Sequence, residues 1–103
     1  MYLYKIYFST DTNYNNSLEL ISELETIFLN NGVNLDGFTI INTSGYYKQE
    51  IEKSYILEYI TNNFGMSKLD IKDTNLIKNI SKLIKGYYNQ NEVLTTKQKI
   101  NIL

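Results

Sequence analysis

Residues 38–60 of this 103-residue chain read FTIINTSGYYKQEIEKSYILEYI, and this stretch decides the predicted fold. Aromatic and β-branched residues at 38–43 and again at 53–60 are typical of strands. The polar Lys48-Gln49-Glu50 between them reverses the chain, and Gly45 is expected to form a bulge or bend. The stretch therefore predicts an antiparallel hairpin, although its turn lacks the Asn-Gly pair of tight hairpins.

On the N-terminal side of the hairpin, the sequence predicts a strand and then a helix. Residues 2–8 are aromatic and β-branched, and polar turn formers follow them. Asn16 is a capping residue with Glu19 three positions further on, which is typical of a helix start. Apolar residues then recur at helical spacing as far as Asn31, and Gly32 is expected to end the helix.

On the C-terminal side, a second helix and a last strand are predicted. Asp73 is the expected cap of this helix, and Gly86 is its expected end. A strand is predicted near residues 92–97. The apolar residues that would share one face of the helix are Leu76, Ile77, Ile80, Leu83 and Ile84.

The order strand, helix, strand, strand, helix, strand predicts an α+β fold of the ferredoxin-like β-α-β-β-α-β type. Its four-stranded antiparallel sheet would carry both helices on one face. Residues 1–103 are expected to form one domain. No apolar run is long enough to span a membrane, and the first residues lack the pattern of a signal peptide, so a cytoplasmic protein is expected.

The composition excludes much chemistry. The chain contains no His, Cys or Arg, and its ten basic residues are all Lys against eleven Asp and Glu. It therefore has no His- or Cys-based nucleophile, no ordinary zinc site and no guanidinium to grip phosphate or guanine. We expect no enzyme, no cofactor and no metal. The acidic residues, whose spacing matches no metal-binding loop, include Glu50, Glu52, Glu58, Asp70 and Asp73.

The ten Tyr and four Phe indicate where binding would occur. Side chains alternate between the two faces of a sheet, so we place Ile6 and Phe8 with Ile56 and Ile60 on the covered face. The open face would then be apolar and aromatic, which suits a planar ligand, a partner protein or a second copy of the chain. Its members would be Leu3, Lys5, Tyr7, Tyr55, Leu57 and Tyr59.

Lysines and paired tyrosines elsewhere in the chain also bear on ligand binding. Nucleic acid is not an expected partner because the net charge is −1, whereas a few Lys and one Tyr suffice for a small nucleotide. The doublets Tyr46-Tyr47 and Tyr87-Tyr88 would each place one ring in the core and one at a pocket mouth. The Lys78, Lys82 and Lys85 row is expected to be a solvated helix face.

Four short motifs from residue 35 onward resemble a family of small, largely uncharacterised bacterial and phage proteins. The family carries a DG-x-T strand, a G-x-aromatic strand end, an E-x-S strand start and a Q-E-S-V entry to the last strand. The resemblance implies the β-α-β-β-α-β fold and a phage or bacterial setting, and it brings no agreed activity. The matching residues here are Asp36-Gly37-Phe38-Thr39, Gly45-Tyr46-Tyr47, Glu52-Lys53-Ser54 and, one residue out of step, Gln90-Asn91-Glu92-Val93.

We therefore expect a non-enzymatic phage-type protein that antagonises a defence system in the cytoplasm of the bacterial host. It would bind a defence protein or sequester a nucleotide second messenger, and a homo-oligomer is expected. The alternative is an interaction protein that forms a homodimer through its open sheet face and binds no small molecule. The predicted ligand-binding residues are Lys5, Tyr7, Tyr47, Lys48, Tyr55, Tyr59 and Tyr88.

Overall fold

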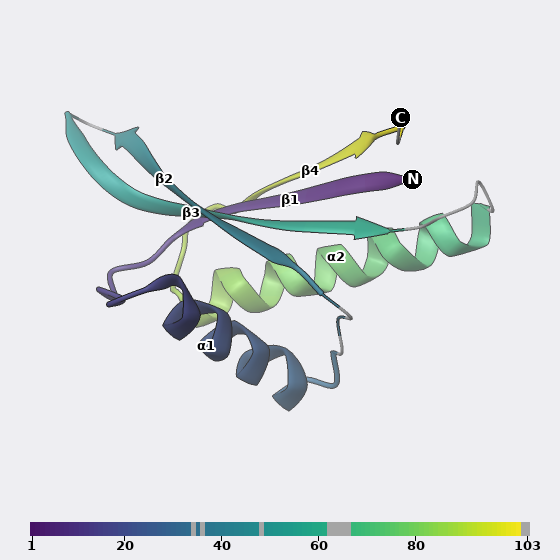
Figure 1. Cartoon of the computed structure of the whole chain (residues 1–103), viewed down its shortest axis with the longest axis horizontal. Helices are drawn as coiled ribbons and strands as arrows, with labels where there is room; N and C mark the ends of the chain where they lie inside the picture. The colour runs from purple at the N-terminus through teal and green to yellow at the C-terminus, as the bar shows by residue number, and fades with distance from the viewer. Residues whose placement is uncertain (34, 36, 48, 62–66, 102–103) are drawn as a thin grey trace.

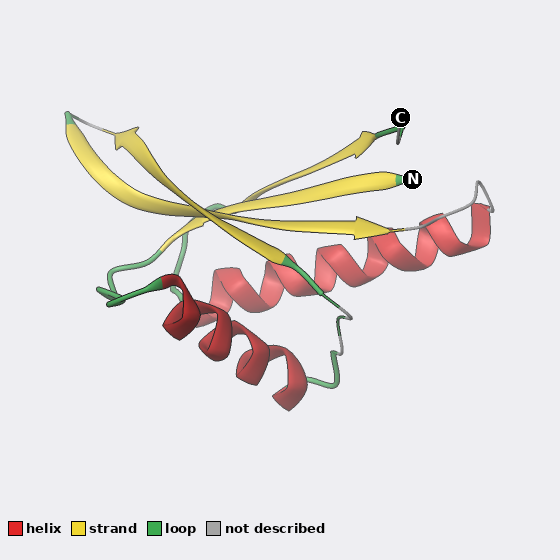
Figure 2. Ribbon diagram, viewed as in Figure 1, coloured by secondary structure: helices red, strands yellow, loops and turns green. Residues whose placement is uncertain are grey.

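The computed structural model describes residues 1–33, 35, 37–47, 49–61 and 67–101. Four strands form one antiparallel sheet in the order β2-β3-β1-β4, and both helices cover the same face of it (Figures 1 and 2). The predicted α+β, ferredoxin-like fold is confirmed. In chain order the elements are β1 (Tyr2–Ser9), α1 (Ser17–Asn30), β2 (Thr39–Tyr47), β3 (Glu50–Thr61), α2 (Ser67–Tyr87) and β4 (Leu94–Lys99).

The β2–β3 hairpin is longer than predicted. Its pairing runs without interruption from Thr39 opposite Glu58 to Tyr47 opposite Glu50, so Gly45 pairs in register with Glu52 and forms no bulge. The strand pairing continues through polar residues because backbone hydrogen bonds stabilise it. The sequence prediction relied on apolar side chains, and these do not indicate where backbone pairing ends. The turn end of the hairpin extends past both helices in Figure 1.

The predicted assignment of faces is wrong for β3. Residues directly opposite one another in an antiparallel pair lie on the same face. Tyr55 and Leu57, expected on the open face, are 7% and 0% exposed beneath the helices, and Ile60, expected in the core, is 55% exposed. Alternation along one strand leaves two choices, and the predicted one also placed the charged Glu58 on the covered face, between Ile56 and Ile60. The register with β1 excludes that choice. The pairs that share the covered face are Tyr4–Tyr59, Ile6–Leu57 and Phe8–Tyr55.

The uncovered face of the sheet carries exposed apolar side chains among polar ones, and only some of its predicted members lie there. Tyr7 lies between Ile56 of β3 and Leu94 of β4, and Leu94 is 60% exposed. Lys5 faces Glu58 across the β1–β3 pair, and Lys5 Nζ lies 3.6 Å from Glu58 Oε1. This surface thus combines exposed aliphatic side chains with one partly solvated ion pair.

Helix α1 begins and ends as the sequence predicts. The Asn16 side chain accepts a hydrogen bond from the backbone N–H of Glu19 at 3.1 Å. At the other end Gly32 has φ +72, and the N–H of Val33 donates to the carbonyl of Phe28 at 2.8 Å. These bonds satisfy backbone groups that a helix end leaves unpaired, and they close the helix over the buried Val33 side chain.

Helix α2 departs from both predicted ends. It begins at Ser67, so Asp73 lies inside it, and it continues through Gly86. The left-handed residue that ends it is Asn89, with φ 52, and the N–H of Gln90 donates to the carbonyl of Lys85 at 2.9 Å. An established helix adds one hydrogen bond per residue, so it extends beyond the stretch with a clear apolar period. Asn tolerates the left-handed conformation better than most residues, and it takes the role expected of Gly86.

The last strand runs over Leu94–Lys99, two residues later than predicted at its start. Among the described residues, no helix is long and apolar enough to cross a membrane. The buried core lies between the sheet and the helices, and its members are Tyr4, Ile6, Phe8, Leu20, Leu24, Ile27, Phe28, Val33, Tyr55, Leu57, Ile77, Ile80, Ile84 and Tyr88.

Candidate functional site

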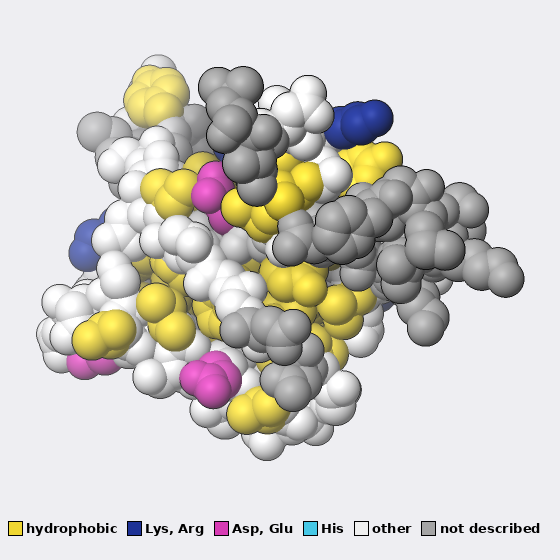
Figure 3. All heavy atoms as spheres, turned by 45° about the vertical axis from the view of Figure 1, so that its right-hand side comes forward, with side chains coloured by type: hydrophobic (Ala, Val, Ile, Leu, Met, Phe, Trp, Pro, Cys, Tyr) yellow, Lys and Arg dark blue, Asp and Glu magenta, His cyan; other side chains and the backbone are white. Residues whose placement is uncertain are grey.

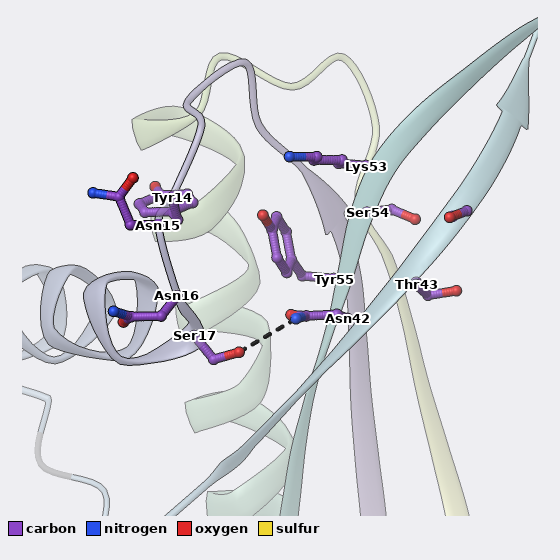
Figure 4. Close-up of a pocket in the computed structure, with 10 residues that line it drawn as sticks. Tyr14, Asn15, Asn16, Ser17, Asn42, Thr43, Lys53, Ser54 and Tyr55 are labelled. Carbon is purple, nitrogen blue, oxygen red and sulfur yellow. Dashed lines mark hydrogen bonds between the residues drawn. The ribbon is translucent and has the colours of Figure 1, made fainter.

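A pocket lies where the β2–β3 hairpin passes the beginning of α1 (Figure 4). Its volume is about 490 Å³, within the range typical of small-molecule sites, about 300–1,000 Å³. Three chain segments form it: the end of the β1–α1 loop with the first residue of α1, the middle of β2 and the first half of β3. The lining residues are Tyr14, Asn15, Asn16, Ser17, Asn42, Thr43, Ser44, Lys53, Ser54 and Tyr55.

Two tyrosine rings form the aromatic part of the pocket. Tyr55 projects from β3 toward the loop that carries Tyr14 (Figure 4), and the two rings meet edge to face with centroids 6.1 Å apart. Behind them, Phe8 packs on Tyr55 at 5.8 Å and stacks on Tyr88 at 5.6 Å. Aromatic packing of this kind fixes ring orientation, so the pocket has a firm apolar wall on one side.

A carboxylate of α1 holds the hydroxyl of Tyr14. Tyr14 Oη and Tyr88 Oη each donate to Glu23 Oε1 at 2.7 Å, and the two hydroxyl oxygens are 3.2 Å apart. Burial, followed by the hydrogen bonds to Tyr14 and Glu23, raises the pKa of Tyr88 far above its usual value. Burial also raises the pKa of Tyr14. Both phenols therefore remain protonated donors at physiological pH.

The rest of the lining is polar. Asn42 Nδ2 donates to Ser17 Oγ at 3.3 Å, which links β2 to the first turn of α1 (Figure 4). The Asn15 side chain donates to Glu19 Oε1 at 3.0 Å. Lys53 is exposed and adds the positive charge of the lining. The pocket thus offers aromatic faces, neutral amides and hydroxyls, and one cation, which suits a ligand with a planar heterocycle and an anionic group.

The predicted ligand-binding residues do not come together. Tyr55 lines the pocket, and Tyr88 supports it from behind through Tyr14 and Glu23. Tyr59 lies on the covered face of the sheet beside Tyr4, so its expected place on the open face is wrong. Lys5 and Tyr7 lie on the uncovered face. Lys48 and the side chain of Tyr47 lie outside the described residues.

The structure also places the Tyr87-Tyr88 doublet and the lysine row of α2. Tyr88 is 9% exposed and Tyr87 is 57% exposed, so one ring of this doublet lies in the core, as predicted. The buried ring is Tyr88, which was expected at a pocket mouth, and that part of the prediction is wrong. Lys78, Lys82 and Lys85 are all exposed on α2. The face of the molecule in Figure 3 carries many hydrophobic side chains and no broad group of Lys among the described residues.

The sequence predicts no metal site, and the structure describes only some of the acidic side chains on which that prediction rests. Where side chains are described, no three acidic residues gather into a group that could hold an ion. Glu58 pairs with Lys5. The side chains of Glu50, Glu52, Asp70 and Asp73 lie outside the described set.

Sequence reasoning missed most of the pocket, including Tyr14 and Asn42. The run Tyr14-Asn15-Asn16-Ser17 signals a helix start, and its polar side chains are explained by that role alone. Asn42 is the one amide within residues 39–47, a stretch otherwise suited to a strand, and that departure is a weak local signal of a site. Neither signal shows that the two segments meet.

The fold places the chain among small four-stranded α+β proteins, and solved structures with this fold are known from phages. The chain superposes on a phage SAM lyase in its apo state with a TM-score of 0.67, at 19% identity, covering 94% of this chain and 78% of that one. It superposes on a phage SAM lyase in complex with S-methyl-5′-thioadenosine with a TM-score of 0.68, at 18% identity, covering 95% and 80%. No protein-family model and no curated protein matches the sequence.

This likeness overturns the prediction of a non-enzymatic protein. Two solved structures that share the fold over nearly the whole chain are of phage SAM lyase, an enzyme. The prediction rested on the lack of His, Cys and Arg. That lack excludes particular nucleophiles and acid–base groups, but it does not exclude a reaction whose leaving group departs without their help. The phage setting of the predicted family agrees with these neighbours, although no family match supports that family itself.

Proposed function

We propose that this chain is a lyase that converts S-adenosylmethionine to S-methyl-5′-thioadenosine. The observation that carries the proposal is the superposition, over 95% of the chain, on a phage SAM lyase that holds this product. The pocket between the β1–α1 loop and the hairpin supports it, because its volume of about 490 Å³ accommodates a nucleoside with a short side chain.

The chemistry of the substrate fits a chain of this composition. The sulfur of S-adenosylmethionine is a cation, so the electron pair of a breaking carbon–sulfur bond returns to it and leaves a neutral thioether. When sulfur separates from the four-carbon amino acid fragment, that thioether is S-methyl-5′-thioadenosine. As that bond breaks, either the fragment's own carboxylate oxygen bonds to the released carbon, which gives a lactone, or a proton passes from the neighbouring carbon to solvent, which gives an alkene. Because the leaving group is already activated, binding and orientation supply much of the catalysis, and no imidazole or thiol is needed.

The pocket residues have matching roles in this proposal. The faces of Tyr14 and Tyr55 would pack against adenine or attract the sulfonium, since aromatic rings favour both. Asn42 would hydrogen-bond a polar group of the nucleoside, and the ammonium of Lys53 would pair with the substrate carboxylate.

The test is incubation of the purified chain with S-adenosylmethionine in water enriched in heavy oxygen, followed by chromatography and mass spectrometry. A lyase gives S-methyl-5′-thioadenosine well above the enzyme-free blank, with a four-carbon fragment that initially contains no heavy oxygen. Homoserine that carries heavy oxygen from the start would instead mean hydrolysis. A rate equal to the blank would contradict the proposal.

A matched pair of variants tests the location of the site. Asn42→Ala removes an amide from the pocket, and Asn79→Ala removes the same group from the exposed surface of α2. The loss of one hydrogen bond to the ligand is expected to lower kcat/KM roughly tenfold in Asn42→Ala, and Asn79→Ala should match the wild type. Equal activity of both variants would place the site elsewhere.

The expected antagonism of a host defence takes a different form under this proposal. A lyase would act by consuming S-adenosylmethionine, which deprives host enzymes that use it as a cofactor or methyl donor. Bacteria that express the chain should therefore show a lower S-adenosylmethionine content than bacteria that express an inactive variant. An unchanged content, together with activity in vitro, would contradict this cellular role.

A further inference from the structure

Glu23 connects three parts of the fold behind the pocket. It lies on the second turn of α1, and one of its oxygens, Oε1, accepts hydrogen bonds from two tyrosines at 2.7 Å each. Tyr14 comes from the β1–α1 loop, and Tyr88 directly follows the end of α2. Hydrogen bonds from neutral donors to a carboxylate are among the stronger ones in proteins, so this arrangement fixes both hydroxyls.

The ring of Tyr14 depends on this anchor. The loop residues just before it, Asp11, Thr12 and Asn13, are exposed, whereas Tyr14 is half-buried. The Tyr14 ring packs against the core and makes an edge-to-face contact with Tyr55 on the pocket side. Its hydroxyl is directed to Glu23 and Tyr88 on the other side. A ring held at both ends is restricted in position, and a ring held by one edge contact is not.

We propose that Glu23 is a positioning residue, which holds the Tyr14 ring beside Tyr55 as part of the aromatic wall of the pocket. It does not itself line the pocket; it acts through the Tyr14 hydroxyl. The consequence for ligand affinity rests on the proposed function, because the ligand used to measure it is S-methyl-5′-thioadenosine. The position of the ring does not rest on that function.

The chain offers matched variants for the test. Glu23→Ala removes the acceptor, and Glu23→Gln keeps a side-chain oxygen at the same distance along the side chain. Glu25→Ala makes the same change of charge and size on α1, at an exposed position that lines a different hollow, together with Ile21 and Leu29. Tyr14 is observed through the ring signals of carbon-labelled tyrosine in NMR spectra, assigned by their loss in Tyr14→Phe.

The NMR signals of the Tyr14 ring test whether Glu23 positions that ring. In Glu23→Ala the Tyr14 signals should move away from their wild-type positions, because the ring leaves the vicinity of Tyr55. In Glu23→Gln and in Glu25→Ala they should stay in place. Unchanged Tyr14 signals in Glu23→Ala would overturn the proposal, and if Glu23→Ala does not fold, failure of Glu23→Gln to retain the wild-type signals would do so.

Titration with S-methyl-5′-thioadenosine measures the consequence for the pocket. The dissociation constant should rise roughly tenfold in Glu23→Ala, and return to within about twofold of wild type in Glu23→Gln. Wild-type affinity in a Glu23→Ala protein whose Tyr14 signals have moved would overturn the role of the ring as a pocket wall. If wild type neither binds this nucleoside nor turns over S-adenosylmethionine, the proposed function fails, and the ring signals still decide the role of Glu23.

Discussion

The carboxylate of Glu23 offsets the free-energy cost of burying the Tyr88 hydroxyl. The side chain is 9% exposed, and its hydroxyl donates to Glu23 at 2.7 Å. A buried hydroxyl without a partner would lose its hydration and gain nothing in return, which costs about 1–3 kcal/mol. The same carboxylate also serves Tyr14, so one acidic residue stabilises both the end of α2 and the loop at the pocket.

The raised pKa values of these tyrosines predict a dependence of stability on pH. Burial raises the pKa of Tyr88, and less strongly that of Tyr14, above the ordinary value of 10.0. The folded protein therefore retains these protons when the unfolded chain loses them. Their contribution to the free energy of unfolding is complete below about pH 10 and is lost as the pH rises above it.

Urea denaturation between about pH 9 and pH 11 measures this loss. Wild type should lose stability steeply across the upper half of the range, and Tyr88→Phe should lose less, because one of the two groups is gone. Tyr46→Phe removes a hydroxyl from a side chain that is 73% exposed and serves as the control. The same slope in wild type and Tyr88→Phe would contradict the prediction.

The ends of the helices are set by backbone conformation more than by residue type. Gly32 and Asn89 both have positive φ and both end a helix, whereas Gly86 lies within α2. The sequence pattern identified the glycine after α1 correctly and chose the wrong residue after α2. The continuation of α2 has a packing reason: it carries Tyr88 onto the buried side, one turn beyond the buried Ile84.

A pair of glycine substitutions distinguishes the two positions. A Cβ added at Gly32 or at Gly86 would meet nothing within 4 Å, so the backbone alone decides the outcome. Gly86→Ala should raise the free energy of unfolding by about 0.5–1 kcal/mol, because alanine is the better helix former. Gly32→Ala should lower it by about 1 kcal/mol or more, because φ is +72 there. Urea denaturation of both variants provides the measurement, and the same sign for both would contradict this account.

The molecule as a whole has two unlike sheet faces. The covered face carries the core, and the hairpin passes beside α1 at the edge of this layer to form the pocket (Figures 1 and 4). The uncovered face carries Tyr7, Ile56, Ile60 and Leu94, and its centre has one ion pair. Exposed apolar side chains that gather on one face in this way are typical of a contact surface.

The homo-oligomer expected from the sequence remains a proposal, with the uncovered face as its interface. Sedimentation should show wild type heavier than a monomer at micromolar concentration. Tyr7→Glu places a charge at the centre of the uncovered face and should shift the protein toward the monomer. The control is Tyr87→Glu, which changes the same residue type on α2, where the side chain is 57% exposed. A monomeric wild type would rule the proposal out.

The sequence by itself determined the kinds of elements and their order, and with them the ferredoxin-like topology. Helical and strand periods, the Asn16 cap and the Gly32 end are local, since neighbouring residues produce them through short-range hydrogen bonds and side-chain spacing. Chain order and the handedness of crossovers then leave few topologies.

Only the tertiary structure decided which face β3 buries and where the pocket lies. A shift of one residue in the pairing of β3 with β1 would exchange Tyr55 and Leu57 for Ile56 and Glu58 on the covered face. The alternation is the same in both sets, but the second set would bury the carboxylate of Glu58. The pocket joins residues 14–17 to residues 42–44 and 53–55. These segments meet because the hairpin packs beside α1, and contacts between distant parts of a chain leave no period in its sequence.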